Sequence, residues 1–253
     1  MSIFQTIILG IVQGVTEWFP VSSSGHLVLF EHWLDLKNLA VEFDIFLHLA
    51  SLLVVIIFFR KQIWEVLRLM FKPKSFLHHE RQYWGWYILL STGITGVLGW
   101  MFYQQIDGFR NPVSVAGWLI FTSLLLLATA FRKEKGSFGL MHAIVLGFMQ
   151  GLAVLPGVSR SGVVIAMALI LGLKKRDSFD YAFLLAIPAI AGSAILTLPN
   201  LQWQWIYGLG FLVTAVVGYL TLGWLKKIID KNYFHWFFIY TLILALIIFS
   251  INY

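Results

Sequence analysis

The chain contains one short segment twice, at a constant spacing of 137 residues and without a gap. Between residues 9–25 and 146–162, eight of 17 positions are identical: Leu, Gly, Gln, Gly, Val, Ser, Ser and Gly. Self-similarity of this kind is the signature of an internal duplication. We therefore predict a single domain made of two repeats, residues 1–137 and residues 138–253.

The composition places this duplication in a membrane. Hydrophobic residues make up 59% of the chain and charged residues only 12%, as expected of an integral membrane protein. Six apolar stretches approach the length needed to cross about 30 Å of hydrocarbon: 43–59, 84–102, 113–131, 180–199, 206–225 and 234–250. The sequence predicts an all-α integral membrane protein with six transmembrane helices.

The net charge of +6 does not indicate a nucleic-acid partner, because the basic residues sit in short loops between apolar stretches. Four segments, 60–83, 132–137, 174–176 and 226–231, carry 15 of the 18 Lys and Arg residues. Cytoplasmic loops of membrane proteins are enriched in Lys and Arg. We predict that these loops are cytoplasmic and that both termini lie outside.

Each repeat begins with two apolar stretches that are too short to span, separated by a turn rich in Pro, Gly and Ser. They are Ile3–Val15 and Gly25–Leu34, then Leu140–Leu155 and Gly162–Leu173. We predict re-entrant hairpins whose turns line a polar cavity, since bare backbone is not tolerated in lipid. Three spans follow each hairpin, so the second repeat would be inverted and the two turns would meet near the midplane.

Other features predict structural roles. Segment Arg60–Lys72 has one apolar face and is typical of a helix lying on the membrane surface. Asp44 and Asp180 are expected to cap the starts of spans, and His48 and His142 are interpreted as hydrogen-bonded structural residues. Mid-span glycines are expected to allow close helix approach: Gly93, Gly96 and Gly99.

Three ionisable residues in or next to the hairpin turns carry the chemistry. Glu17 and His26 occur only in the first copy and Arg160 only in the second, and ionisable groups at membrane depth are functional candidates by default. Hydroxyls and backbone N–H groups at a helix start bind anions, so the turns predict two phosphate cradles. The predicted phosphate-binding residues are Ser22, Ser24, Gly25, Ser159, Ser161 and Gly162.

The residues of these turns resemble a known family. Segments 13–26, 156–162 and 183–188 are similar to the motifs of the undecaprenyl-pyrophosphate phosphatase family, also called the bacitracin-resistance family. The resemblance implies an inner-membrane enzyme that removes the terminal phosphate of a polyprenyl diphosphate at the outer face and so recycles a lipid carrier. It also implies a divalent cation, Mg²⁺ or Ca²⁺. Many members have glutamate where this chain has Gln13, and Ala-Thr where it has Val163-Val164.

The predicted catalytic residues are Glu17, Ser23, His26 and Arg160. Arg160 would neutralise phosphate charge through a bidentate contact. Glu17 follows Gln13 by one helical turn, so the two share a face and could share a metal or hold a water. They are the predicted metal ligands, with a base as the alternative role for Glu17. His26 would protonate a leaving phosphate or accept the phosphoryl group, with Ser23 as the competing nucleophile; the sequence does not choose between them.

Two other kinds of protein remain open. A transporter or flippase of polyprenyl phosphate would use the same inverted repeats and cradles, and an assembly protein would bind no ligand. The presence of Glu17 and His26 beside a phosphate cradle favours an enzyme, because transport alone needs no proton-handling pair. Polyprenyl diphosphate and membrane lipid are the predicted partners, and the oligomeric state stays open, with a homodimer as one possibility.

Overall fold

A computed structural model of the chain describes residues 1–33, 41–71, 81–103, 105–109, 111–134, 136–197 and 204–252, and within these ranges all regular structure is helical. The helices of the first half are α1 (Ile3–Thr16), α2 (Ser23–Trp33), α3 (Val41–Phe58), α4 (Arg60–Met70), α5 (Trp84–Tyr103), α6 (Ile106–Phe109), α7 (Pro112–Ala128) and η1 (Thr129–Phe131). Those of the second half are α8 (Leu140–Leu152), α9 (Arg160–Ile170), α10 (Lys175–Thr197), α11 (Trp205–Asp230), η3 (Phe234–Trp236) and α12 (Phe237–Asn252).

The predicted all-α membrane architecture is confirmed. Within the described ranges, five helices are long and apolar enough to cross a membrane, and α3 with α4 makes a sixth if that bent pair is counted as one. The bounds differ from the prediction for α10, which begins five residues before the expected 180. They also differ for α11, which ends five residues after the expected 225. The added turns of both helices contain charged residues. A helix can include such residues at its ends, but a hydropathy pattern leaves them out of the predicted span.

The helix over Arg60–Met70 confirms the predicted amphipathic segment, and α4 bends by 72° away from α3. Trp64 and Phe71 are exposed, whereas Val66 is buried. Lys72, the predicted end of this segment, lies outside the described residues, as do Leu34 and residues 198–199, which end two other predicted stretches. Because of this bend, α4 runs in a different direction from α3.

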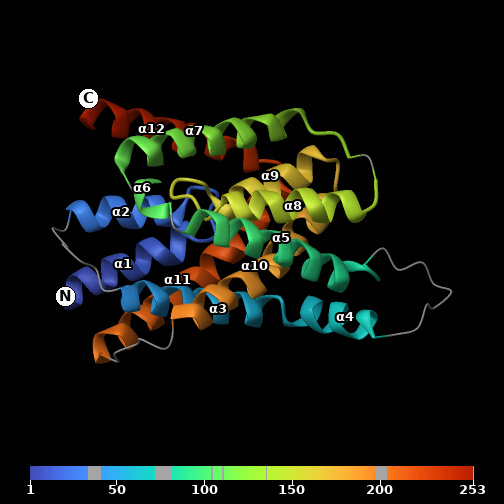
Figure 1. Cartoon of the computed structure of the whole chain (residues 1–253), viewed down its shortest axis with the longest axis horizontal. Coiled ribbons are helices and arrows are strands. Elements are labelled where there is room, and N and C mark those ends of the chain that lie inside the picture. Colours follow the sequence, from blue (N-terminus) through green and yellow to red (C-terminus); the bar gives the residue numbers. More distant parts are fainter. Residues whose placement is uncertain are drawn as a thin grey trace.

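Four helices, α1, α2, α8 and α9, have only 11 to 14 residues, too short to cross about 30 Å at 1.5 Å per residue. In Figure 1, α1 and α2 lie in the left part of the molecule and α8 and α9 in the right part, so the two connecting turns face each other near the centre. Helix α1 packs on α11, α8 packs on α5, and α7 packs on α12.

Glycines spaced four apart bring the first helix of each pair close to its partner. A β-carbon on Gly14 would lie 2.9 Å from Val217 Cβ of α11. At the position 137 residues later, a β-carbon on Gly151 would lie 2.5 Å from Leu98 Cδ1 of α5. Gly10 and Gly147, one turn earlier, approach the same partner helices. Small residues at this spacing allow backbones in membranes to pack directly.

The mid-span glycines chosen from the sequence do not share this role. Among the described atoms, none lies within 4 Å of a β-carbon built on Gly93 or Gly96, and Gly99 meets only Val154 at 3.6 Å. The prediction was wrong for Gly93 and Gly96, because no other described helix approaches their side of α5. Composition alone cannot tell which face of a span is covered.

We expect Gly147→Ala to destabilise the protein by about 1–3 kcal/mol, the usual cost of overpacking. A β-carbon there would lie 2.7 Å from Ser91 Cα and 2.8 Å from Ser91 O, both backbone atoms that cannot rotate away. Gly93→Ala on α5 is the control, since its added methyl meets open space. Thermal unfolding in detergent should show a lower midpoint for Gly147→Ala only; equal midpoints would contradict the close packing.

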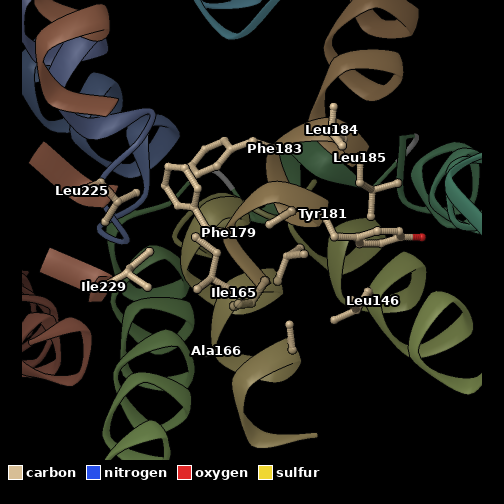
Figure 2. Packing of buried hydrophobic residues seen from close by; sticks show 14 of the residues in the cluster. Leu146, Ile165, Ala166, Phe179, Tyr181, Phe183, Leu184, Leu185, Leu225 and Ile229 are labelled. Atoms are coloured by element: carbon tan, nitrogen blue, oxygen red, sulfur yellow. The ribbon is translucent and has the colours of Figure 1, made fainter. Parts of the chain in front are cut away.

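The main hydrophobic core lies around α10. Figure 2 shows Phe179 and Phe183 directed toward Leu225 and Ile229 of α11, and Tyr181 directed to the other side, where Leu146 lies. The buried Tyr181 hydroxyl is 2.8 Å from Ser91 Oγ. Phe183 also meets the ring of Trp18 at 5.5 Å, edge to face. Trp18 follows Glu17, so the core packs directly behind the first hairpin turn.

Asp180 does not cap a helix, contrary to the prediction. It is the sixth residue of α10, is buried, and its Oδ2 lies 2.8 Å from Nη2 of Arg81. Asp177 accepts from the same nitrogen at 2.9 Å, and Arg81 lies over the ring of Trp84. Burial acts against the charge of Arg81, but the two carboxylates outweigh it and raise the pKa of the guanidinium. Asp44 is likewise the fourth residue of α3, past the capping position.

Candidate functional site

The first hairpin turn joins α1 to α2 and presents a row of polar groups. Glu17 continues the last turn of α1, with its N–H donating to Gln13 O at 3.0 Å. Ser22 adopts a positive φ of 68°, which turns the chain sharply into α2. Its Oγ accepts from the N–H of Gly25 at 3.3 Å, as an N-cap does.

The second turn is built in a similar way. Gly157 has φ of 97°, and a side chain there would also collide with Val115 O of α7 at 2.4 Å. Ser159 caps α9, with its Oγ accepting from the N–H of Gly162 at 3.2 Å. Arg160 is therefore the first residue of α9, at the positive end of that helix.

The two turns are in direct contact. A β-carbon on Gly25 would lie 3.7 Å from Gly157 Cα, and one on Gly162 would lie 3.0 Å from Pro20 Cβ. Ser161 Oγ donates to Phe19 O at 3.2 Å. Residues separated by more than 130 positions thus form one surface, and the side chain of Arg160 reaches across it.

Glu17 is the centre of the resulting site. Its Oε1 pairs with Nη2 of Arg160, and its Oε2 accepts from Ser23 Oγ at 2.7 Å and from Gln13 Nε2 at 3.2 Å. Nε2 of His48 lies 3.9 Å from the same oxygen. Glu17 itself is only 6% exposed, so this carboxylate is held away from bulk water by its partners.

Two polar atoms beside Glu17 are buried without a hydrogen-bond partner in the described structure: Nη1 of Arg160 and Oε1 of Gln13. Buried polar groups are nearly always paired, so each such atom calls for an explanation. One is a cationic donor and the other a neutral acceptor. An anion for the first and a cation for the second would satisfy both.

His26 lies apart from the carboxylate. Its Nδ1 is 2.8 Å from Ser22 O, and its Nε2 is 2.7 Å from the hydroxyl of Tyr240 on α12. The two rings are stacked at 5.7 Å, with 10° between their planes. His26 is buried, whereas Tyr240 is exposed.

The structure thus places Gln13, Glu17, Ser23 and Arg160 in one network. The remaining serines pair within their own turns, Ser22 with Ser24 at 3.3 Å and Ser159 with Ser161 at 3.4 Å. Ser22 and Ser159 are also the helix caps, so their hydroxyls have a turn-forming role beside the predicted phosphate binding. Gly25 and Gly162 supply the N–H groups that these two caps bind.

His48 and Tyr240 were not predicted at the site. His48 had a usable signal in the sequence, because it is an ionisable residue within an apolar stretch. In the structure its Nδ1 lies 2.8 Å from the Asp44 carbonyl oxygen one turn earlier, as Nδ1 of His26 does from the Ser22 oxygen. That contact directs Nε2 outward from α3. Tyr240 lies 214 residues from His26, and no sequence motif connects the two. His142, by contrast, accepts from Gly139 N–H at 3.1 Å at the start of α8, a structural role.

Together, the apolar helices and the buried Glu17, with Ser23 and Arg160 bonded to it, define a multi-pass membrane protein with a polar site between the two turns. Residues 6–247 match the family described as bacitracin resistance protein BacA, and the chain belongs to this family. An "Undecaprenyl-diphosphatase 2" of Halalkalibacterium halodurans is 36% identical, covering 98% of this chain and 96% of the relative.

Relatives from other organisms are similar to the same extent. An "Undecaprenyl-diphosphatase" of Methanobrevibacter smithii is 33% identical over 98% of this chain and 97% of its own length. One of Elusimicrobium minutum is 36% identical, with the same coverage of both chains. The similarity therefore extends over nearly the whole chain, including both hairpin turns.

Proposed function

We propose that the protein is an undecaprenyl-diphosphatase, which hydrolyses undecaprenyl diphosphate to undecaprenyl phosphate and inorganic phosphate. In a cell this reaction recycles the lipid carrier of peptidoglycan synthesis and supports bacitracin resistance. Family membership and the names of the relatives support this function. The observation that carries it is the buried, unpartnered Nη1 of Arg160 beside the Glu17–Ser23 pair. A terminal phosphate bound there would meet a cationic donor and a serine oxygen already hydrogen-bonded to a base.

The chemistry that we propose starts at Ser23. Its Oγ attacks the terminal phosphorus while Glu17 Oε2, its hydrogen-bond acceptor at 2.7 Å, takes the proton. A serine–phosphorus bond forms, the anhydride bond breaks, and undecaprenyl phosphate leaves with the electron pair. Arg160 stabilises the charge on the transferred group. The phosphate-binding role of the two cradles belongs to this proposal as well.

Water then hydrolyses the phosphoserine. The water oxygen bonds to phosphorus, the bond to Ser23 Oγ breaks, and Glu17 returns its proton to that oxygen. We assign the proton that the water loses to His26, the second base of the site. This scheme uses the four predicted catalytic residues and gives Ser23, not His26, the covalent step.

A divalent cation fits the residues present. The unpartnered Oε1 of Gln13 and the carboxylate of Glu17 would hold Mg²⁺ or Ca²⁺, hard cations that bind oxygen ligands. No cluster of three His, Cys, Asp or Glu side chains occurs in the described part of the chain, so substrate phosphates would complete the coordination. When bound, the ion would neutralise phosphate charge.

We expect Gln13→Glu to lower the Mg²⁺ concentration needed for half-maximal binding by about tenfold, because affinity rises with the number of charged ligands. Isothermal titration of the detergent-solubilised protein with MgCl₂ measures this directly. Gln150→Glu changes the equivalent residue of the second copy, which lies beside Thr95 and Leu185 instead of a carboxylate. An equal gain in Gln150→Glu, or weaker binding in Gln13→Glu, would argue against the metal assignment.

We also propose that the protein lies in the inner (plasma) membrane with the site facing outward. The basic loops gather at one end: Arg81 bonds to Asp177, Lys175 to the Asp230 carbonyl and Arg132 to Asn232. Enrichment of Lys and Arg is typical of the cytoplasmic side. Figure 1 places both termini at one end and α4 at the other, so the hairpin of α1 and α2 would start from the outer side.

The inverted duplication, residues 1–137 and 138–253, belongs to the same proposal. It is supported by the matching contacts of α1 with α11 and of α8 with α5, and by glycines at equivalent positions in both. In this arrangement the hairpins are re-entrant from opposite faces. A homodimer stays a prediction.

Phosphate release from undecaprenyl diphosphate tests the function. Purified protein in detergent with Mg²⁺ should release one phosphate per lipid, as measured by a colorimetric phosphate assay. The transporter alternative predicts the opposite pattern: lipid movement between the leaflets of reconstituted vesicles, without phosphate release.

A further inference from the structure

The partners of His26 assign its tautomer. A carbonyl oxygen can only accept a hydrogen bond, so Nδ1, at 2.8 Å from Ser22 O, carries the proton. In a neutral imidazole the other nitrogen is then an acceptor. Nε2 therefore accepts from the Tyr240 hydroxyl at 2.7 Å. Neutral His26 has one basic lone pair, on Nε2, and this lone pair accepts the hydrogen bond from Tyr240.

Tyr240 also fixes the plane of the imidazole. The stacked rings at 5.7 Å and the two hydrogen bonds leave His26 no freedom to rotate. His26 is only 5% exposed, while Tyr240 is 48% exposed. The tyrosine hydroxyl thus contacts the buried base, and the tyrosine itself is half exposed.

We infer that Tyr240 is the residue through which His26 acts. This inference rests on the proposed phosphatase function and adds a residue to it. As the attacking water loses a proton to Tyr240 Oη, the Tyr240 proton passes to His26 Nε2, so the tyrosine stays neutral and the imidazole becomes charged. Occupation of Nε2 by Tyr240 also keeps His26 from receiving the phosphoryl group, in agreement with attack by Ser23.

Tyr240→Phe tests this role because it removes one hydroxyl and keeps the stacked ring. Loss of one hydrogen bond in the transition state corresponds to about tenfold in rate, so we expect kcat for undecaprenyl diphosphate to fall on the order of tenfold. KM should stay within about twofold, since no phosphate contact is lost. Tyr219→Phe on α11 is the matched control, with an equally exposed tyrosine.

A double variant separates a relay from a packing role. In His26→Gln the base is gone, so adding Tyr240→Phe should cause no further loss of kcat. Independent, multiplying losses would overturn the inference, as would normal kcat in Tyr240→Phe or a fall matched by Tyr219→Phe.

The hydrogen bond itself is measured without activity. In protein with ¹⁵N-labelled histidine, with His26→Gln used for assignment, Nδ1 of His26 should be the protonated nitrogen. Nε2 should shift toward the non-bonded imine position in Tyr240→Phe. A proton on Nε2 in the unmodified protein would overturn the inference. If the unmodified protein showed this tautomer but released no phosphate, the pair would stand and the proposed function would fall.

Discussion

Arg160→Ala is expected to lower kcat/KM for undecaprenyl diphosphate by roughly 10³-fold, in the range found when a phosphate-stabilising arginine is removed. Nη1 of Arg160 is buried with no hydrogen-bond partner in the described structure and is free for phosphate, while Nη2 pairs with Glu17. The substitution removes both the donor and the charge that offsets the substrate phosphates. Phosphate release from the purified variant measures the effect.

Loss of folding has to be separated from loss of chemistry in this variant. Removing one partner of a buried ion pair costs about 3–5 kcal/mol, because Glu17 would be left buried without its counter-ion. Arg160→Lys keeps the charge but not the planar fork, so it should keep more stability than Arg160→Ala while activity still falls. Near-normal turnover in a folded Arg160→Ala protein would exclude Arg160 from the site.

Ser23→Ala is expected to lower kcat by at least about 10³-fold, since removal of a nucleophile leaves only binding and electrostatic stabilisation. Among the described serines of the two turns, Ser23 is the one that donates to Glu17, at 2.7 Å. Its neighbour provides the control, because Ser24 Oγ lies 3.3 Å from Ser22 Oγ instead. Ser24 belongs to the phosphate cradle and supplies no nucleophile in this scheme, so Ser24→Ala should lower kcat far less than Ser23→Ala.

Covalent labelling tests the same step. Acid quenching during turnover of lipid labelled in its terminal phosphate should recover the label on Ser23 in the unmodified protein and none in Ser23→Ala. Full turnover by Ser23→Ala, or label found on His26, would contradict attack by serine.

Much of the fold follows from local properties of the sequence. Runs of apolar residues identify the spans because each helix in lipid has to satisfy its own backbone. Breaks such as Pro20–Ser22 and Pro156–Ser159 mark the turns because these residues favour caps and turns. The four short helices and α4 were predicted close to their observed bounds for this reason.

The face on which each helix packs was harder to predict from the sequence. Gly93 was expected to approach another helix, whereas Gly147 and Gly151 actually do. Asp180 was expected at a helix start and instead pairs with Arg81, about 100 residues away. In an almost uniformly apolar span, the sequence carries little signal for which side meets protein and which side meets lipid.

The sequence by itself determined the class of protein, the two hairpin turns and the ionisable residues worth testing, because burying a charge at membrane depth is costly and such residues are few. Only the tertiary structure decided how they are arranged. In the structure, Arg160 pairs with Glu17, Ser23 donates to the same carboxylate, and His48 lies 3.9 Å from it. Tyr240 contacts Nε2 of His26. Except for the local Ser23–Glu17 bond, these contacts join helices distant in the chain. Hydrogen bonds of that kind depend on how helices pack, which no local pattern encodes.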